Sequence, residues 1–91
     1  MGKFNDAQPL LERALAITEK TLGLEHLEIG IQMNNLGSLL QTMGRLEEAL
    51  PLMERALPIY EQQMGVAHEK TVLRANNLVT LREQVNQRRL R

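Results

Sequence analysis

The sequence predicts an all-α protein in which antiparallel helical hairpins stack on one another. Three observations favour this fold class. The chain repeats itself at a spacing of 42 residues, its apolar residues recur every three or four positions, and a glycine stands where three of its apolar runs end. One Phe, one Tyr and no Trp leave Leu, Met, Ile and Ala to build the core, which suits packed helices better than sheets.

The internal repeat covers most of the chain. The segment PLMERALPIYEQQMGVAH at 51–68 is a near-copy of PLLERALAITEKTLGLEH at 9–26, and Asn-Asn-Leu recurs at the same spacing, at 34–36 and at 76–78. A fixed period of this length is typical of stacked two-helix units. We therefore expect residues 1–91 to form a single domain built from repeated hairpins.

The first predicted helix covers residues 4–22. Gly23 follows it. Helices often end in a residue with a left-handed backbone conformation, which glycine adopts with the least strain. The apolar face that we expect to be buried consists of Phe4, Ala7, Leu11, Ala14, Leu15, Thr18 and Leu22.

A full helical hairpin is predicted next, over residues 27–64. Its first helix extends from Leu27 to Met43, before Gly44, and its second covers residues 46–64, before Gly65. The first helix has the apolar residues Ile29, Met33, Leu36, Leu39, Leu40 and Met43, and the second has Leu46, Ala49, Leu50, Met53, Ala56, Leu57, Tyr60 and Met64. Very short turns force neighbouring helices to be antiparallel.

Small residues and prolines refine this hairpin. Gly37, Ala49 and Ala56 stand where the two helices would cross, and small side chains let two backbones approach closely. Pro51 and Pro58 each remove a main-chain hydrogen bond inside the second helix. Because they are two turns apart, they share one side, and we expect them to face solvent on a slightly bent helix.

The last predicted helix covers residues 69–89. Its apolar face would contain Val72, Leu73, Ala75, Leu78, Val79, Leu81 and Val85. We interpret it as a capping helix, with Arg82 and the segment 87–89 solvating its outer face.

Composition excludes several classes of function. Lys plus Arg and Asp plus Glu number 11 each, which argues against a dedicated binder of nucleic acid or acidic membranes. No apolar run approaches the roughly 18 residues of a membrane span. The absence of cysteine excludes disulfides and thiolate metal sites, and we expect a soluble protein of a reducing compartment, the cytoplasm.

The segment NNLGSLLQTMGRLEEALPLMERALPIYEQQMG closely resembles tetratricopeptide repeats, and the 42-residue period with G-x-x-H and NNL is similar to the longer kinesin-light-chain subtype. The resemblance implies a short right-handed superhelix of helical hairpins, which binds a peptide or protein partner in a concave groove without catalysis and without a cofactor. Leu27 and Glu69 depart from the family, which usually has proline after the histidine.

The resemblance also suggests where such a partner would bind. The polar residues that share one side of the second and fourth helices would line the groove, where side-chain amides can pair with the main chain of an extended peptide. This candidate site consists of Asn34, Asn35, Ser38, Gln41, Asn76, Asn77, Thr80 and Gln84. Asn35 and Asn77 are the stronger candidates, and one Asn of each pair could instead bond the backbone of a neighbouring helix. Arg74 could contribute one charge near this groove, but we expect it to be a solvated surface residue.

Self-association is the alternative function. The sequence starts in the middle of a repeat, so we expect the first helix to lack the helix that it would normally pack against. We therefore expect two copies to associate as a homodimer. They would either dock their first helices or exchange helices across a turn such as Gly44 or Gly65. The residues expected at this contact are Phe4, Ala7, Leu11 and Ala14. The sequence does not decide between a natural short protein and a piece of a longer repeat array.

Other chemistry is disfavoured. His26 and His68 are on successive repeats without cysteine nearby, so we expect each to cap a turn rather than to bind zinc. Nothing in the sequence supplies a nucleophile or a phosphate loop, and we expect neither a catalytic residue nor a metal ligand. The basic C-terminal residues Arg88, Arg89 and Arg91 could contact nucleic acid, but they also favour the dipole of the helix that they end.

Overall fold

The computed structural model describes residues 2–23 and 26–90, with side chains described at 6–23 and 26–90. This part of the chain forms four α-helices and no strand, which confirms the all-α class. The helices are α1 (Gly2–Leu22), α2 (Leu27–Thr42), α3 (Leu46–Met64) and α4 (Glu69–Arg89). α1 begins two residues before its predicted start, and α2 ends at Thr42, because Met43 is its C-cap.

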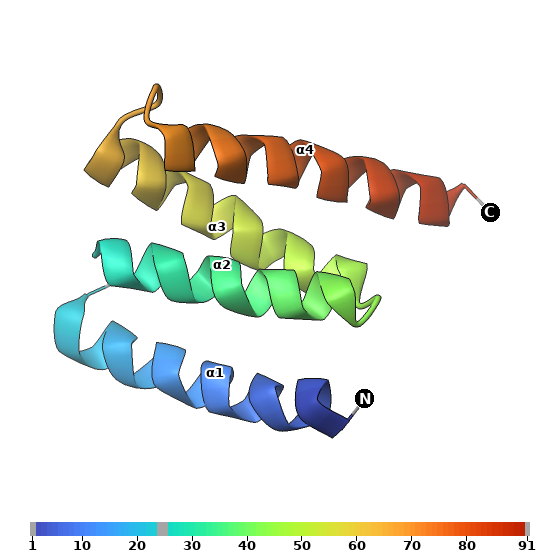
Figure 1. Cartoon of the computed structure of the whole chain (residues 1–91), viewed down its shortest axis with the longest axis horizontal. Coiled ribbons are helices and arrows are strands. Elements are labelled where there is room, and N and C mark those ends of the chain that lie inside the picture. The colour runs from blue at the N-terminus through green and yellow to red at the C-terminus, as the bar shows by residue number, and fades with distance from the viewer. Residues whose placement is uncertain (1, 24–25, 91) are drawn as a thin grey trace.

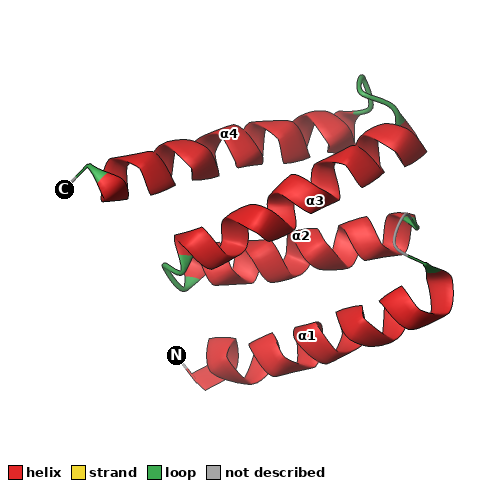
Figure 2. Ribbon diagram, turned by 180° about the vertical axis from the view of Figure 1, so that it is seen from behind, coloured by secondary structure: helices red, strands yellow, loops and turns green. Residues whose placement is uncertain are grey.

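The helices pack mainly against their neighbours in the chain, α1 on α2, α2 on α3 and α3 on α4. Figure 1 shows α1 and α4 at opposite edges, and Figure 2, seen from behind, shows α3 in front of α2. The Cα atoms span 39 × 32 × 18 Å. The smallest dimension corresponds to roughly two helix diameters, so the molecule is a two-layer slab of antiparallel helices.

The core lies between α2 and α3 and extends to both flanking helices. α3 contributes the most buried apolar residues, and it packs against α2 on one side and α4 on the other. The buried apolar residues are Leu15, Ile29, Met33, Leu36, Leu40, Leu46, Ala49, Met53, Ala56, Ile59, Tyr60, Leu78, Leu81 and Val85.

The crossing of α2 and α3 depends on two glycines that are two helical turns apart. A Cβ atom at Gly37 would be 3.0 Å from Met53 Cγ and 3.5 Å from the carbonyl oxygen of Ala49. A Cβ atom at Gly30 would be 2.9 Å from Ile59 Cγ2 and 3.6 Å from the carbonyl oxygen of Ala56. The predicted role of the small residues at this crossing is confirmed, with Gly30 as an additional member.

The turns after α2 and α3 need glycine for its backbone freedom. Gly44 has a φ of 81° and Gly65 a φ of 94°, a region that side chains with a Cβ atom rarely adopt. Pro51 and Pro58 are both exposed, as predicted, so the hydrogen bonds that they omit leave carbonyl groups on the wet side of α3.

The predicted apolar faces of α1 and α4 were partly wrong. Leu22 is exposed, and on α4 Val72, Leu73 and Val79 are exposed, while the polar Thr71 is buried and donates its hydroxyl to the carbonyl oxygen of Tyr60 at 3.3 Å. Periodicity identifies every apolar stripe of a helix, but each outer helix packs along its length against one described neighbour only.

Candidate functional site

The predicted polar site follows the exposed side of α2 and α4. Asn35 on α2 is exposed and Ser38 is half-buried. Their repeat equivalents on α4, Asn77 and Thr80, are both exposed. The duplicated amides are therefore available to solvent on both helices, and Asn76 is exposed as well.

Two members of the predicted site contact each other across the helices. The side-chain amide of Gln41 on α2 donates from Nε2 to Oε1 of Gln84 on α4 at 2.8 Å. Gln84 also lines a pocket of about 150 Å³ together with Leu46, Gln87 and Arg88. The polar residues of α2 and α4 are thus brought side by side at this end of the molecule.

Asn34 is different from the other predicted residues. Its side chain is only 5% exposed, whereas its repeat equivalent Asn76 is exposed on α4. Burial leaves Asn34 little surface to offer a ligand, so it is the weakest member of the predicted site.

Sequence reasoning missed two apolar residues on the same side. Ile31 and Leu73 are repeat equivalents and precede Asn35 and Asn77 by four residues, so each lies one turn away from its asparagine on the same helix face. Leu73 is exposed and Ile31 is packed partly against the core. The i, i+4 spacing from the asparagines was the signal that could have identified them.

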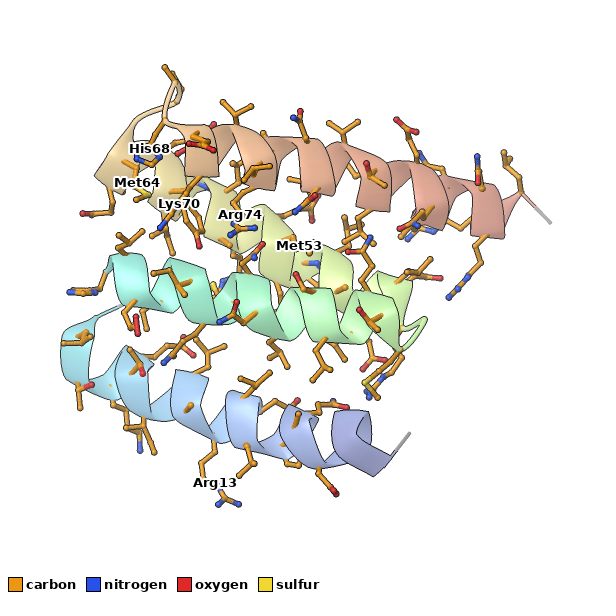
Figure 3. All side chains as sticks on the ribbon, viewed as in Figure 1. Arg13, Met53, Met64, His68, Lys70 and Arg74 are labelled. Atoms are coloured by element: carbon orange, nitrogen blue, oxygen red, sulfur yellow. The ribbon has the colours of Figure 1, made fainter. Side chains whose placement is uncertain are left out.

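Arg74 is not the solvated surface residue that was predicted. Its side chain is half-buried, with its guanidinium carbon 5.5 Å from the centre of the Tyr60 ring. Its Nε is buried without a hydrogen-bond partner, and it forms no ion pair with the described residues. Figure 3 shows Arg74 and Lys70 extending from α4 toward α2. A guanidinium over an aromatic ring gains a favourable cation–π contact.

The two histidines start helices, in agreement with the predicted capping role. His26 Nδ1 accepts a hydrogen bond from the Glu28 N–H at 3.1 Å, and His68 Nδ1 accepts one from the Lys70 N–H at 3.0 Å. Each satisfies a free N–H group of the first turn, as an Asn or Ser N-cap would. Among the described residues, no group of three or more potential ligands could hold a metal ion.

The basic residues near the end of α4 are exposed, as expected for a capping helix, and they also reach back to partners on or just before α3. Arg82 pairs with Glu54 at 3.1 Å, and Arg89 with Glu47 at 3.4 Å. Arg88 donates to the carbonyl oxygen of Gly44 at 2.8 Å. These three cations therefore have partners within the protein, which weakens the nucleic-acid alternative.

Arg45 joins the first helix to the start of the third. Its guanidinium hydrogen-bonds Gln8 on α1 and both carboxylate oxygens of Glu48 at 2.6 Å. The hydrogen bond from Arg45 lowers the pKa of the Glu48 carboxyl, and the same bond raises the pKa of Arg45.

The residues predicted for self-association lie on one side of α1. Ala7, Leu11 and Ala14 are all half-buried, and Leu11 packs against the core cluster. The side chain of Phe4 lies outside the described residues. The two most exposed large apolar residues in the described part of α1 are Leu10 and Ile17, at 62% and 57% exposure, which the helix-face prediction omitted.

Comparison with known families gives one clear relationship. The tetratricopeptide repeat family matches residues 1–87. A comparison with curated proteins gave no match. Within the described chain, every helix is too short or too polar to cross a membrane.

Proposed function

Because the chain belongs to the tetratricopeptide repeat family, and is therefore a protein–protein interaction module, we propose that it binds an extended segment of a partner protein along the exposed side of α2 and α4. Members of this family are generally scaffolds without catalytic activity, and we propose the same for this chain.

The observation that carries the proposal is the duplicated pair of exposed asparagines, Asn35 and Asn77. An amide side chain offers both donors and an acceptor, so it can pair with the main chain of a peptide whatever its side chains are. Two such amides at equivalent repeat positions present the same pairing groups twice along an extended segment.

Neighbouring residues give this binding its chemical preference. Ile31 and Leu73 add apolar surface one turn from each asparagine, which suits an apolar side chain of the bound segment. Arg74 lies three residues before Asn77, on the same side of α4, and has no ion-pair partner among the described residues. A carboxylate near the apolar side chain would satisfy it. The preferred ligand is therefore an extended peptide with one apolar and one acidic residue.

The test is selection of peptides from a displayed random library against the chain, followed by calorimetric titration of the selected sequences. Asn35→Ala with Asn77→Ala should weaken binding at least about tenfold, since each buried amide pairing contributes about 1 kcal/mol or more. The matched control is Asn86→Ala, because Asn86 is exposed on α4 but lies about 180° around the helix from Asn77. Equal weakening by the control, or unchanged affinity in the double variant, would refute the proposal.

The repeat period and the composition support two finer assignments. The 42-residue spacing and the His-capped helices favour the kinesin-light-chain-like subtype within the family. The absence of cysteine is consistent with a cytoplasmic location.

Self-association is a second candidate function, favoured by the exposure of Leu10 and Ile17 on α1. Two large aliphatic side chains in water on the same helix side gain free energy when a partner covers them. A homodimer formed through α1 is compatible with peptide binding along α2 and α4.

A further inference from the structure

One side of α1 has an apolar seam whose two large side chains are left exposed by the described chain. We call Ala7, Leu10, Ala14 and Ile17 the α1 seam; they are spaced by three, four and three residues and therefore lie in one line along the helix. The alanines are half-buried, and Leu10 and Ile17 are exposed. The spacing is that of the contact positions in a two-stranded coiled coil.

The internal repeat shows what this seam does when it is covered. Its equivalents on α3 are Ala49, Leu52, Ala56 and Ile59, all buried or half-buried. There α2 packs so closely that a Cβ atom at Gly30 would be 2.9 Å from Ile59 Cγ2. The same pattern of side chains is therefore competent to pack against a helix, provided that the helix presents small residues at positions seven apart.

The α4 helix does not meet that condition. Val72 and Val79 stand at the repeat positions of Gly30 and Gly37. Even one added Cβ atom at Gly30 would crowd Ile59. The larger Val72, at the equivalent position of α4, would therefore prevent α4 of another copy from packing against the α1 seam as closely as α2 packs against α3. Head-to-tail stacking of copies is thus disfavoured.

The seam itself comes closer to the condition, because alanine adds only a Cβ atom where valine is branched, and two seams would pack at a slightly wider spacing than α2 and α3 do. Ala7 and Ala14 are small residues seven apart, and they alternate with the large Leu10 and Ile17. When two α1 helices run antiparallel with their two-fold axis at residue 12, Ala7 faces the partner's Ile17, and Leu10 faces the partner's Ala14. Every layer then pairs a small residue with a large one, so the seam is complementary to itself.

Charged residues beside the seam fit the same arrangement. Asp6 and Lys20 are exposed near opposite ends of α1, about 21 Å apart at a rise of about 1.5 Å per residue. In the antiparallel pair each Asp6 comes next to the partner's Lys20, which gives two attractive contacts. Arg13, which Figure 3 shows pointing away from the other helices, comes next to the partner's Arg13 and gives one repulsive contact.

We propose that two copies of the chain form a symmetric dimer in which the α1 seams pack antiparallel with their axis at residue 12. The proposal rests on the second candidate function and gives it a geometry. The contact is small, so the dimer is weak and depends on concentration.

Sedimentation equilibrium over a wide concentration range tests the proposal. The chain should sediment as a monomer and dimer in exchange, and Ile17→Glu should abolish the dimer. Because Ile17 is exposed, the variant should keep its helical circular dichroism. Val79→Glu, an equally exposed position on α4, is the matched control and should leave the dimer unchanged.

Two further measurements report the register. Asp6→Lys should weaken the dimer roughly two- to fivefold, and adding Lys20→Asp should restore it. Because the chain has no cysteine, Arg13→Cys introduces a single thiol near the axis, and a short thiol-reactive linker should join two copies there but not in Val79→Cys.

Several outcomes would overturn the proposal. A chain that stays monomeric at every concentration also removes the second candidate function. A dimer that survives Ile17→Glu, or one that Asp6→Lys does not weaken, keeps self-association but refutes this geometry. Assemblies that grow beyond a dimer and disappear in Val79→Glu indicate head-to-tail stacking instead.

Discussion

Gly30 of α2 lies so close to Ile59 of α3 that a Cβ atom on the glycine would be 2.9 Å from the isoleucine Cγ2 and 3.2 Å from its Cβ. The corresponding contact two turns along α2 is softer, because Gly37 faces the flexible side chain of Met53. Both glycines therefore allow α2 and α3 to approach closely, but the side chain that faces Gly30 is stiffer than the one that faces Gly37.

This difference predicts unequal effects of the same substitution. Gly→Ala in a helix interior is worth about 1 kcal/mol of propensity. At Gly30 the β-branched Ile59 cannot move aside easily, so an overpacking cost of about 1–3 kcal/mol should exceed that gain, and Gly30→Ala should lower the free energy of unfolding by up to about 2 kcal/mol. At Gly37 the methionine can adapt, and Gly37→Ala should stay within about 1 kcal/mol of the wild type. Urea denaturation measures both, and a neutral Gly30→Ala would contradict the proposed crossing.

The capping histidines give a second prediction. His68→Ala removes the acceptor of the Lys70 N–H and should cost about 0.5–2 kcal/mol of stability. His68→Asn supplies another acceptor at the N-cap and should retain most of the stability. Thermal melts of the two variants at one pH make the comparison, and equal losses would show that the hydrogen bond contributes little. His26 offers the same pair of substitutions at α2.

Arg74 gives a prediction about ligand preference. Its planar guanidinium lies over Tyr60, a geometry that the ammonium group of lysine does not reproduce. Arg74→Lys should therefore weaken the binding of a selected acidic peptide, although the positive charge is kept. An otherwise identical peptide with Gln in place of its acidic residue should bind the wild type and the variant with similar affinity. If both peptides lose affinity equally, Arg74 supports the fold and not the ligand.

The contact between Arg45 and Glu48 gives a prediction about pH. The hydrogen bond from Arg45 lowers the pKa of the Glu48 carboxyl in the folded chain. Its stabilisation is therefore present above the ordinary glutamate pKa of about 4.3 and is lost as pH falls through the lower folded value. Glu48→Gln should lower Tm slightly at pH 7 and leave it unchanged at pH 2. A Tm difference that is the same at both pH values would contradict this assignment.

The sequence predicted the inner hairpin well. Every apolar residue expected in α3 is buried or packed against the core, because helices on both sides cover its stripes. One-sided packing of α1 and α4 was expected from the missing partner of the first helix and from the capping interpretation of the last, but periodicity does not show which stripe of each helix has the neighbour. For that reason Leu10, Val72 and Val79 were assigned incorrectly or overlooked.

The candidate site was predicted in outline and refined by the structure. Repeat equivalence correctly placed Asn35 and Asn77 on an exposed side, although ligand contact by them stays a prediction. The burial of Asn34 and the position of Arg74 over Tyr60 depend on how helices from different hairpins pack. Such contacts between side chains of different helices leave no pattern in the spacing of residues.

The packing of each helix mainly against its neighbour in the chain has a consequence for the order in which the protein folds. Contacts between residues close in sequence form early and lose little entropy when they close. α2 and α3 can form a hairpin without either outer helix, and α1 and α4 can then join it independently. The chain should accordingly fold outward from its centre and unfold inward from its two ends.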